Sequence, residues 1–232
     1  MKKFLFCIGG KSAALPHAAK HLEDAGCLFC STPSPNVTHY LLDVPTPAGC
    51  VIPEVLSPST CIIGGNLLAF PGWSSLDLLQ DPFYVAENAG ITAHCAIKIA
   101  MNRLSTTLQH CRVLVIGWGR IGKCLADILK ALGADVTVAA RKEADRAILT
   151  ALGYQTISTD GLSDSGYQVI FNTVPVTVLH SQSSASKIDL ASSQGILGPD
   201  VVIARGLPGK EAPEASGELI ARRILHHLGK EN

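Results

Sequence analysis

The sequence predicts an α/β protein with a doubly wound parallel sheet and a smaller N-terminal α/β lobe. The second half of the chain alternates buried-strand runs with helical patterns, which is typical of parallel strands joined by helical crossovers. The length of 232 residues exceeds one average domain by about half. The 21 glycines and 13 prolines, against 5% aromatic residues, indicate many tight turns between short elements.

The smaller lobe is expected over residues 1–84. It opens with an apolar run at 4–8, and a helix is expected over 12–25, where apolar residues recur at helical spacing. Short strands separated by turns rich in proline and serine are expected at 27–30, 40–44 and 61–63. A linker segment at 85–110 is expected to hold a helix that joins the two lobes, because its apolar residues recur at helical spacing from 86 to 108.

The larger domain is expected over residues 111–212. Its apolar runs predict strands at 112–116, 135–140, 154–157, 168–172, 187–191 and 201–204. Helices are expected at 121–132 and 143–152, between the first three of these strands. The last segment, 213–232, is expected to form a C-terminal helix over 215–228 that packs back between the lobes.

Charge and cysteine content exclude several classes of protein. Lysines and arginines equal aspartates and glutamates at 19 each, without a basic block, which argues against nucleic-acid or membrane-surface binding. The apolar run at 4–8 is too short for a secretory signal, and no apolar stretch is long enough for a transmembrane helix. The eight cysteines are expected to be reduced and mostly buried, so we expect a cytoplasmic protein. Cys27 and Cys30 form a single C-x-x-C pair with no second pair at zinc-site spacing, and no metal is expected.

The strongest functional motif is a glycine-rich hexapeptide that follows a buried strand and opens a helix. It consists of Gly117, Trp118, Gly119, Arg120, Ile121 and Gly122. Gly117 allows a tight turn, Gly119 lets a pyrophosphate approach the backbone, and Gly122 allows close packing of helix on strand. The helix N-terminus adds N–H groups and a positive dipole for the phosphates. The motif therefore predicts a dinucleotide site, the alternative being a glycine-rich turn without a ligand.

The end of the next strand indicates which dinucleotide is bound. NAD sites usually place an acidic residue there to hold the ribose 2′-hydroxyl, whereas this chain has Arg141 and Lys142. A guanidinium can grip a 2′-phosphate with two hydrogen bonds, and a carboxylate would repel it. We therefore predict NADP, with NAD possible. The alternative is that both residues only solvate the first turn of the following helix.

Further ligand-binding residues are expected at the carboxyl ends of the later strands, where ligands of such sheets lie. The segments at these positions are 172–175, which begins with Asn172, 189–192 and 205–209, and we expect them to line the nicotinamide half of the cleft. They include Thr173, Val174, Pro175, Asp189, Arg205, Gly206, Pro208 and Gly209. The alternative for each is a purely structural role in a turn or helix cap. His94, beside Thr92 in the linker helix, is expected to face the cleft, where an imidazole can move a proton near neutral pH. The alternative for His94 is a structural histidine.

The motifs together resemble those of the A subunits of bacterial dipicolinate synthases, a family related to the D-2-hydroxyacid dehydrogenases with their Rossmann sheet. The resemblance is carried by residues 115–122, 138–141, 170–175 and 188–192. The most specific element is Gly206-Leu-Pro-Gly209, followed by Ala212-Pro213 and Ser216-Gly217. Gly9, Gly10, Asn88 and Thr92 match the family more faintly.

The resemblance implies an enzyme that oxidises dihydrodipicolinate to dipicolinate during sporulation by hydride transfer to the nicotinamide. It also implies that the partner is a flavoprotein-like B subunit, and related two-lobed dehydrogenases suggest a homo-oligomer, most simply a dimer. His94 would then act as the base, and Arg205 or the N–H groups of Gly206 and Gly209 would hold a substrate carboxylate. Gly9, Gly10, Thr92 and Pro208 would complete the substrate site.

Two departures from the family fall in the part expected to shape the substrate site. The chain has Thr92-Ala-His-Cys95 where the family usually has Thr-Ala-Glu-Gly, and Lys11-Ser12 where the family has acidic and arginine residues. The Arg, Glu and His triad of the hydroxyacid dehydrogenases is not recognisable either. Two alternatives therefore stay open: a related dehydrogenase or reductase acting on another small carboxylate, and a non-catalytic dinucleotide-binding regulatory subunit that senses redox state or scaffolds a partner.

Overall fold

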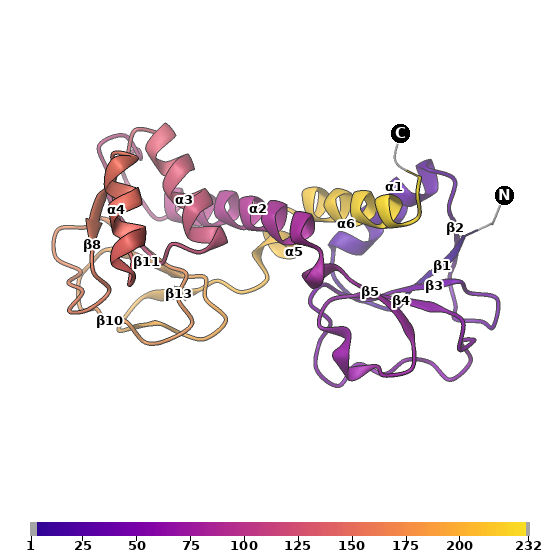
Figure 1. Ribbon diagram of the computed structural model, residues 1–232. Helices are drawn as coiled ribbons and strands as arrows, with labels where there is room; N and C mark the ends of the chain where they lie inside the picture. The colour runs from indigo at the N-terminus through magenta and orange to yellow at the C-terminus, as the bar shows by residue number, and fades with distance from the viewer. Residues whose placement is uncertain (1–3, 231–232) are drawn as a thin grey trace. The chain divides into compact units, whose positions relative to one another are not determined.

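The computed structural model describes residues 4–230, and within it the chain forms two compact units (Figure 1). The first unit combines the chain up to Asn88 with the segment from Pro208 onward, and the second is Ala89–Leu207. The division therefore falls inside one long helix and just before Pro208, rather than at 84, 110 and 212. The C-terminal segment is part of the first unit.

The first unit is built on a parallel five-stranded sheet with strand order β2-β1-β3-β4-β5. The strands are β1 (Leu5–Ile8), β2 (Leu28–Cys30), β3 (His39–Leu41), β4 (Cys61–Gly64) and β5 (Ser74–Asp77). Two short 3₁₀ turns, η1 (Leu67–Ala69) and η2 (Leu78–Gln80), flank β5. The helices are α1 (Ala14–Asp24), α5 (Leu207–Glu211), which begins at the unit boundary, and α6 (Pro213–His227).

The helices α1 and α6 pack closely because a glycine stands at their contact (Figure 1). A Cβ atom at Gly217 would lie 2.5 Å from the carbonyl oxygen of Ala14, so only glycine lets α6 approach the backbone of α1 this closely. Pro213 occupies the first turn of α6, where its missing N–H costs no hydrogen bond. Pro213 thus helps to start α6, and Gly217 lets α6 pack against α1.

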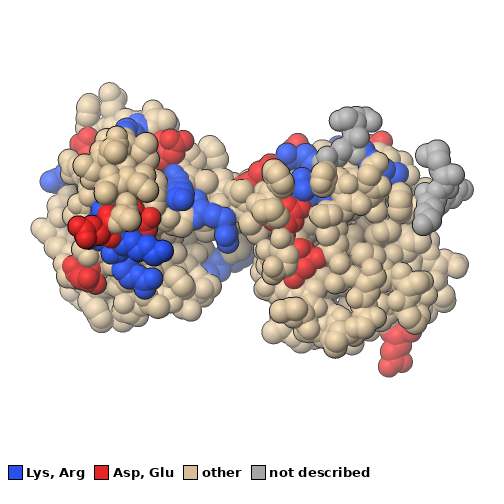
Figure 2. All heavy atoms as spheres, in the orientation of Figure 1, with Lys and Arg blue, Asp and Glu red and all other residues tan. Residues whose placement is uncertain are grey.

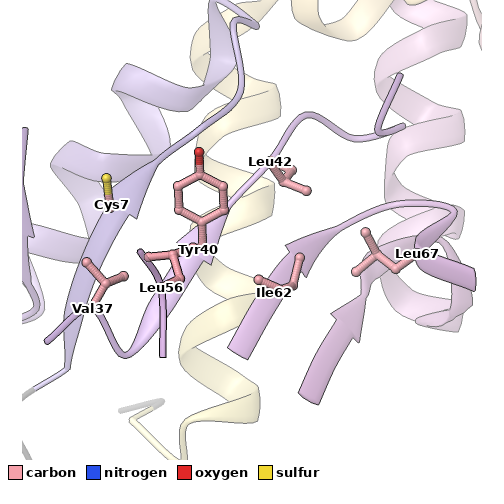
Figure 3. Close-up of a cluster of buried hydrophobic side chains, with 7 residues drawn as sticks. All are labelled: Cys7, Val37, Tyr40, Leu42, Leu56, Ile62 and Leu67. Atoms are coloured by element: carbon pink, nitrogen blue, oxygen red, sulfur yellow. The ribbon is translucent and has the colours of Figure 1, made fainter. Parts of the chain in front are cut away.

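One hydrophobic cluster of the first unit lies on one face of its sheet (Figure 3). It consists of Cys7, Val37, Tyr40, Leu42, Leu56, Ile62 and Leu67. In the close-up these side chains come from β1, β3, β4 and the segments before and after β3 and β4, with the Tyr40 ring near the middle. None of the chain's eight cysteines forms a disulfide bond, and burial together with Cys30 raises the pKa of Cys7 to about 11.

The second unit holds a parallel six-stranded sheet with strand order β13-β11-β9-β6-β7-β8, the order of a Rossmann sheet. Its strands are β6 (Arg112–Ile116), β7 (Asp135–Ala139), β8 (Gln155–Ile157), β9 (Val169–Asn172), β11 (Ser186–Asp189) and β13 (Val201–Ile203). The helices α3 (Arg120–Ala131) and α4 (Glu143–Ala151) connect the first three strands. The long helix α2 (Pro82–Met101) begins in the first unit and ends in the second.

The expected elements match the structure best around the glycine-rich motif and less well elsewhere. The helix expected over 86–108 begins at Pro82 and ends at Met101. It begins earlier than expected because Asp81 caps its first turn by accepting the N–H groups of Phe83 and Tyr84. The strand β5 and a small parallel pair, β10 (Leu179–His180) with β12 (Ile196–Leu197), were not expected. The connections after β9 and β11 contain this pair instead of helices.

Figure 2 shows blue basic and red acidic side chains next to one another in several places on the visible face, while much of that face of the first unit is uncharged. The chain carries equal numbers of the two kinds. Within residues 4–230, no helix is both long and apolar enough to cross a lipid bilayer.

Candidate dinucleotide-binding site

The glycine loop joins the central strand β6 to helix α3. Because β6 pairs with β7 on one side and β9 on the other, the carboxyl ends of three strands meet at this edge, with Ile116 opposite both Ala139 and Asn172. The N–H of Gly117 donates to the Ala139 carbonyl at 2.9 Å, and Gly117 has a φ of 104°, which glycine adopts without strain. The loop thus turns sharply out of the sheet at its first glycine.

Two of the three glycines are required by packing within the protein. A Cβ atom at Gly117 would overlap the Thr173 hydroxyl and lie 2.8 Å from Val174 Cγ2. A Cβ atom at Gly122 would overlap the carbonyl oxygen of Gly117, so the first turn of α3 could not sit against the loop. The tight turn at Gly117 and the close packing at Gly122 are thus seen, and the binding of a cofactor by these residues stays a prediction.

Gly119 differs because no packing contact within the described residues requires a glycine there. A Cβ atom there would meet no heavy atom within 4 Å, and its φ of −83° is open to any residue. Gly119 is the N-cap of α3, whose first turn carries no acidic residue. Free N–H groups, a positive helix dipole and an uncovered backbone together suit the pyrophosphate of a dinucleotide. The loop therefore fits such a cofactor.

The other residues of the loop leave this backbone accessible. Trp118 is half-buried, and its ring lies 6.0 Å from the Tyr154 ring in an edge-on contact, with Lys123 Nζ 5.7 Å from the indole. Arg120 is exposed and Ile121 is half-buried on α3.

The turn after β7 presents the two basic residues expected to select NADP. Arg141 and Lys142 are exposed, and Lys142 is the N-cap of α4. Arg146 Nη1 donates to the carbonyls of Ala140 at 2.7 Å and Arg141 at 2.8 Å, which holds the turn in place. Two cationic side chains thus stand beyond the strand that neighbours the glycine loop.

The loop after β9 is held by a buried asparagine. Asn172 accepts the Val174 N–H and donates to the Val174 carbonyl, both at 3.0 Å, and the Thr173 hydroxyl donates to the Ile116 carbonyl at 2.9 Å. Thr173 and Val174 are half-buried against Gly117, and Pro175 is exposed. These residues lie at the same edge of the sheet as the glycine loop.

Asp189 and Arg205 form one interaction at the carboxyl end of β11. The Asp189 carboxylate is fully buried and accepts N–H groups of Ala191, Gly195 and Ile196 at 2.7–3.2 Å. Arg205 Nη1 donates to the Asp189 carbonyl at 2.7 Å and to its carboxylate at 3.3 Å, while the Arg205 side chain stays 31% exposed. Asp189 thus organises the loop 190–196, and Arg205 presents a guanidinium held by this carboxylate.

The histidine expected to act as the base lies on the exposed face of α2. His94 shares that face with Lys98 and Met101, whereas Thr92 is buried on the opposite side. This part of α2 belongs to the second unit. The catalytic role of His94 stays a prediction.

The remaining predicted substrate residues are divided between the two units. Gly206, with a φ of 64°, is exposed near the end of the second unit, and Pro208 begins the return to the first. A Cβ atom at Gly209 would lie 2.9 Å from Ser12 Oγ, so α5 packs against the loop before α1. Gly209 therefore has a packing role in the first unit.

The Gly9-Gly10 pair follows β1 in the first unit and has structural reasons to be glycine. A Cβ atom at Gly9 would overlap the Tyr40 ring, and one at Gly10 would lie 2.5 Å from Leu15 Cδ1. Asp43 accepts the Lys11 N–H at 2.9 Å and the Ser12 N–H at 2.7 Å through one carboxylate oxygen. The loop is thus closely packed, and its contact with a substrate stays a prediction.

Two supporting residues were not expected from the sequence: Arg146 and Asp43. Asn172 was expected at the cleft, and the structure shows that its buried amide holds the loop after β9. Arg146 and Asp43 carry no local signal, since their hydrogen bonds depend on how the chain turns.

The comparison with protein families supports the nucleotide site. Residues 92–180, which include the glycine loop, match the model of the D-isomer specific 2-hydroxyacid dehydrogenase, NAD binding domain. The A subunit of dipicolinate synthase from Bacillus subtilis (strain 168) is 30% identical over 201 residues, covering 80% of this chain and 67% of that protein. The chain belongs to the family of dipicolinate synthase A subunits.

Solved structures share the fold along nearly the whole chain. The structure of the dipicolinate synthase A subunit from Bacillus halodurans has a TM-score of 0.81 at 20% identity and covers 97% of both chains. That of the corresponding dipicolinate synthase chain from Bacillus subtilis has a TM-score of 0.77 at 23% identity, covering 99% of this chain and 97% of the other. The protein is thus a dipicolinate synthase A-like member of the oxidoreductases with a nicotinamide-dinucleotide-binding domain.

Proposed function

We propose that this protein is an NADP-dependent oxidoreductase that oxidises dihydrodipicolinate to dipicolinate. The observation that carries the proposal is the uncovered backbone of Gly119 at the N-terminus of α3, next to a turn with two exposed cations. The pyrophosphate would lie on the first turn of α3, and Arg141 with Lys142 would hold the 2′-phosphate. The 30% identity to a protein named as the A subunit of dipicolinate synthase supports the substrate.

The proposed reaction removes one hydride and one proton from the dihydropyridine ring, which becomes aromatic. When bound, the nicotinamide of NADP⁺ supplies the acceptor of the hydride. His94 would take the proton, because its side chain is exposed and an imidazole can accept a proton near neutral pH. Arg205, partly exposed and held by Asp189, would bind a substrate carboxylate. A homodimer and a partner B subunit belong to the same proposal.

The cofactor preference is tested by charge reversal at the turn after β7. Arg141→Asp should weaken NADPH binding at least tenfold and leave NADH binding within about threefold, because the carboxylate repels only the 2′-phosphate. Lys20→Asp, an exposed change on α1, is the matched control and should alter neither affinity. Titration of nucleotide fluorescence measures both constants. An Arg141→Asp variant that still prefers NADPH would overturn the assignment.

The substrate is tested by thermal unfolding with each nucleotide, with and without dipicolinate. Stabilisation by dipicolinate only in the presence of NADP or NADPH is expected, since the carboxylates would bind beside a seated nucleotide. Nucleotide stabilisation without any effect of dipicolinate would favour the second candidate, a dehydrogenase for another small carboxylate, which the departures at 92–95 and 11–12 also favour. His94→Ala should abolish turnover with NADPH binding intact, and unchanged turnover would remove His94 from the mechanism.

A further inference from the structure

A cavity of about 700 Å³ lies at the amino edge of the sheet in the second unit. Its lining includes Ser186, the first residue of β11, and Gln168 and Asp200, which directly precede β9 and β13. The glycine loop follows the carboxyl end of β6 and therefore belongs to the opposite edge of this parallel sheet. The cavity is distinct from the dinucleotide site.

The cavity contains a buried cation that lacks a counter-ion. Lys187 lines it and is 1% exposed, and its Nζ donates to the Ser183 carbonyl at 2.7 Å. In the part of the chain that the structure describes, no carboxylate lies within ion-pair distance of this ammonium group. A buried lysine is rarely found without an ionic partner, because burial removes the hydration of its charge. One carbonyl oxygen occupies only one of its three donor positions.

A second cation stands at the same cavity. Arg103 Nε donates to Ser186 Oγ at 3.2 Å, so the residue that opens β11 orients the guanidinium. Asp200, exposed and with a φ of 56°, contributes the carboxylate in the lining. With two cations and one carboxylate, the lining has an excess of one positive charge. Serine hydroxyls such as that of Ser184 add neutral hydrogen-bonding groups.

We propose that this cavity binds the oxyanion group of a small metabolite, a phosphate or a carboxylate, through Lys187 and Arg103. An oxyanion supplies the missing counter-ion and forms charge-assisted hydrogen bonds with both side chains. The volume falls within the range of about 300–1,000 Å³ that small-molecule sites occupy, so an organic body fits beside the anionic group. This ligand would be an effector rather than the substrate, because the cavity belongs to the edge away from the glycine loop.

Calorimetric titration of the full chain with inorganic phosphate, and separately with malonate, tests the proposal. Saturable binding of one equivalent of at least one of the two anions is expected, and the preferred anion identifies the class of oxyanion. Arg103→Gln, an exposed change, should weaken binding at least tenfold, and Lys187→Met should abolish it while removing the uncompensated charge. Lys20→Gln on α1 is the control and should leave binding unchanged.

A further variant separates this cavity from the glycine loop, which can itself attract phosphate. Gly119→Asp places a carboxylate on the open backbone of the loop, and the proposed site should bind its anion unchanged in this variant. Lack of saturable binding by either anion would overturn the proposal. Binding that survives Arg103→Gln but is lost in Gly119→Asp would equally overturn it. If Lys187→Met does not fold, Arg103→Gln and Ser184→Asp, both exposed, decide the question by the same criterion.

Discussion

The contrast between Gly119 and Gly122 gives a prediction that separates ligand binding from folding. Gly119→Ala adds a methyl group to open space at a backbone conformation that alanine adopts, so the fold should be retained. Gly122→Ala places the same methyl group into the carbonyl oxygen of Gly117, which is backbone and cannot rotate away. The first variant should therefore affect the dinucleotide and the second the protein itself.

The magnitudes follow from these surroundings. An alanine N-cap costs less than about 1 kcal/mol relative to glycine, so Gly119→Ala should unfold close to the parent chain. Overpacking at Gly122 costs about 1–3 kcal/mol, which the gain of about 1 kcal/mol in helix propensity only partly offsets. A methyl group between the pyrophosphate and the backbone should weaken NADPH binding by about tenfold or more, which corresponds to about 1.4 kcal/mol.

Thermal unfolding with and without NADPH measures both effects. At an NADPH concentration of about 100 times the parent dissociation constant, the ligand should stabilise the parent by about 2.7 kcal/mol, or about 8 °C in Tm for a chain of this size. If Gly119→Ala binds NADPH tenfold more weakly, the same NADPH concentration should stabilise it by about 1.4 kcal/mol, or about 4 °C in Tm. Gly122→Ala should have a lower Tm without ligand. A Gly119→Ala variant with parental affinity would refute the assignment of the open backbone to the pyrophosphate.

Two further predictions concern buried carboxylates, both measured by urea unfolding. Asp189→Asn turns an amide toward N–H donors and removes the charged partner of Arg205, so it should lower the free energy of unfolding by about 2–4 kcal/mol. The exposed Asp127→Asn is the control and should be neutral. Equal stabilities of the two variants would contradict the role of Asp189. Burial raises the pKa of Asp81, but hydrogen bonds from Arg223 and its other donors outweigh burial and lower the pKa to about 2. The stabilisation by this carboxylate is therefore complete above about pH 4 and lost as the pH falls toward 2. Asp81→Asn should lower the free energy of unfolding by about 3 kcal/mol at pH 7 and by progressively less below pH 4. If the difference in stability between the variant and the parent did not change with pH, the Asp81 carboxylate would not be the group that links stability to pH.

The second unit was predictable around the glycine loop because its signals are local. The apolar run of β6, the hexapeptide from Gly117 to Gly122 and the helix after it follow one another in the sequence. The β10–β12 pair was not predictable, because strands of two residues are too short to show an alternating pattern. The start of α2 was missed although Pro82 follows the capping residue Asp81, a known helix start signal.

The candidate site shows the same limit for side chains. The roles of Gly117 and Gly122 could be stated from the motif, since the turn and the helix contact lie within six residues. The hydrogen bonds from the loop 190–196 to Asp189 could not be predicted. No local sequence pattern distinguishes a carboxylate that holds its own loop from one that contacts a ligand. The exposure of His94 depends on which face of α2 is covered by the rest of the protein. Because α2 is buried on much of its surface, the spacing of its apolar residues does not show which face is exposed.

The return of the chain to the first unit at Pro208 has a consequence for biosynthesis. The strand and helix order of the second unit is continuous, so this unit can fold as soon as residues 89–207 have left the ribosome. The first unit must wait, because α1 buries its apolar face against α6, which is translated later and docks through Gly217. During that interval Ala14 and Ala18 of α1 lack the helix that packs against them, and the nascent first unit is the stage at which chaperones would be needed.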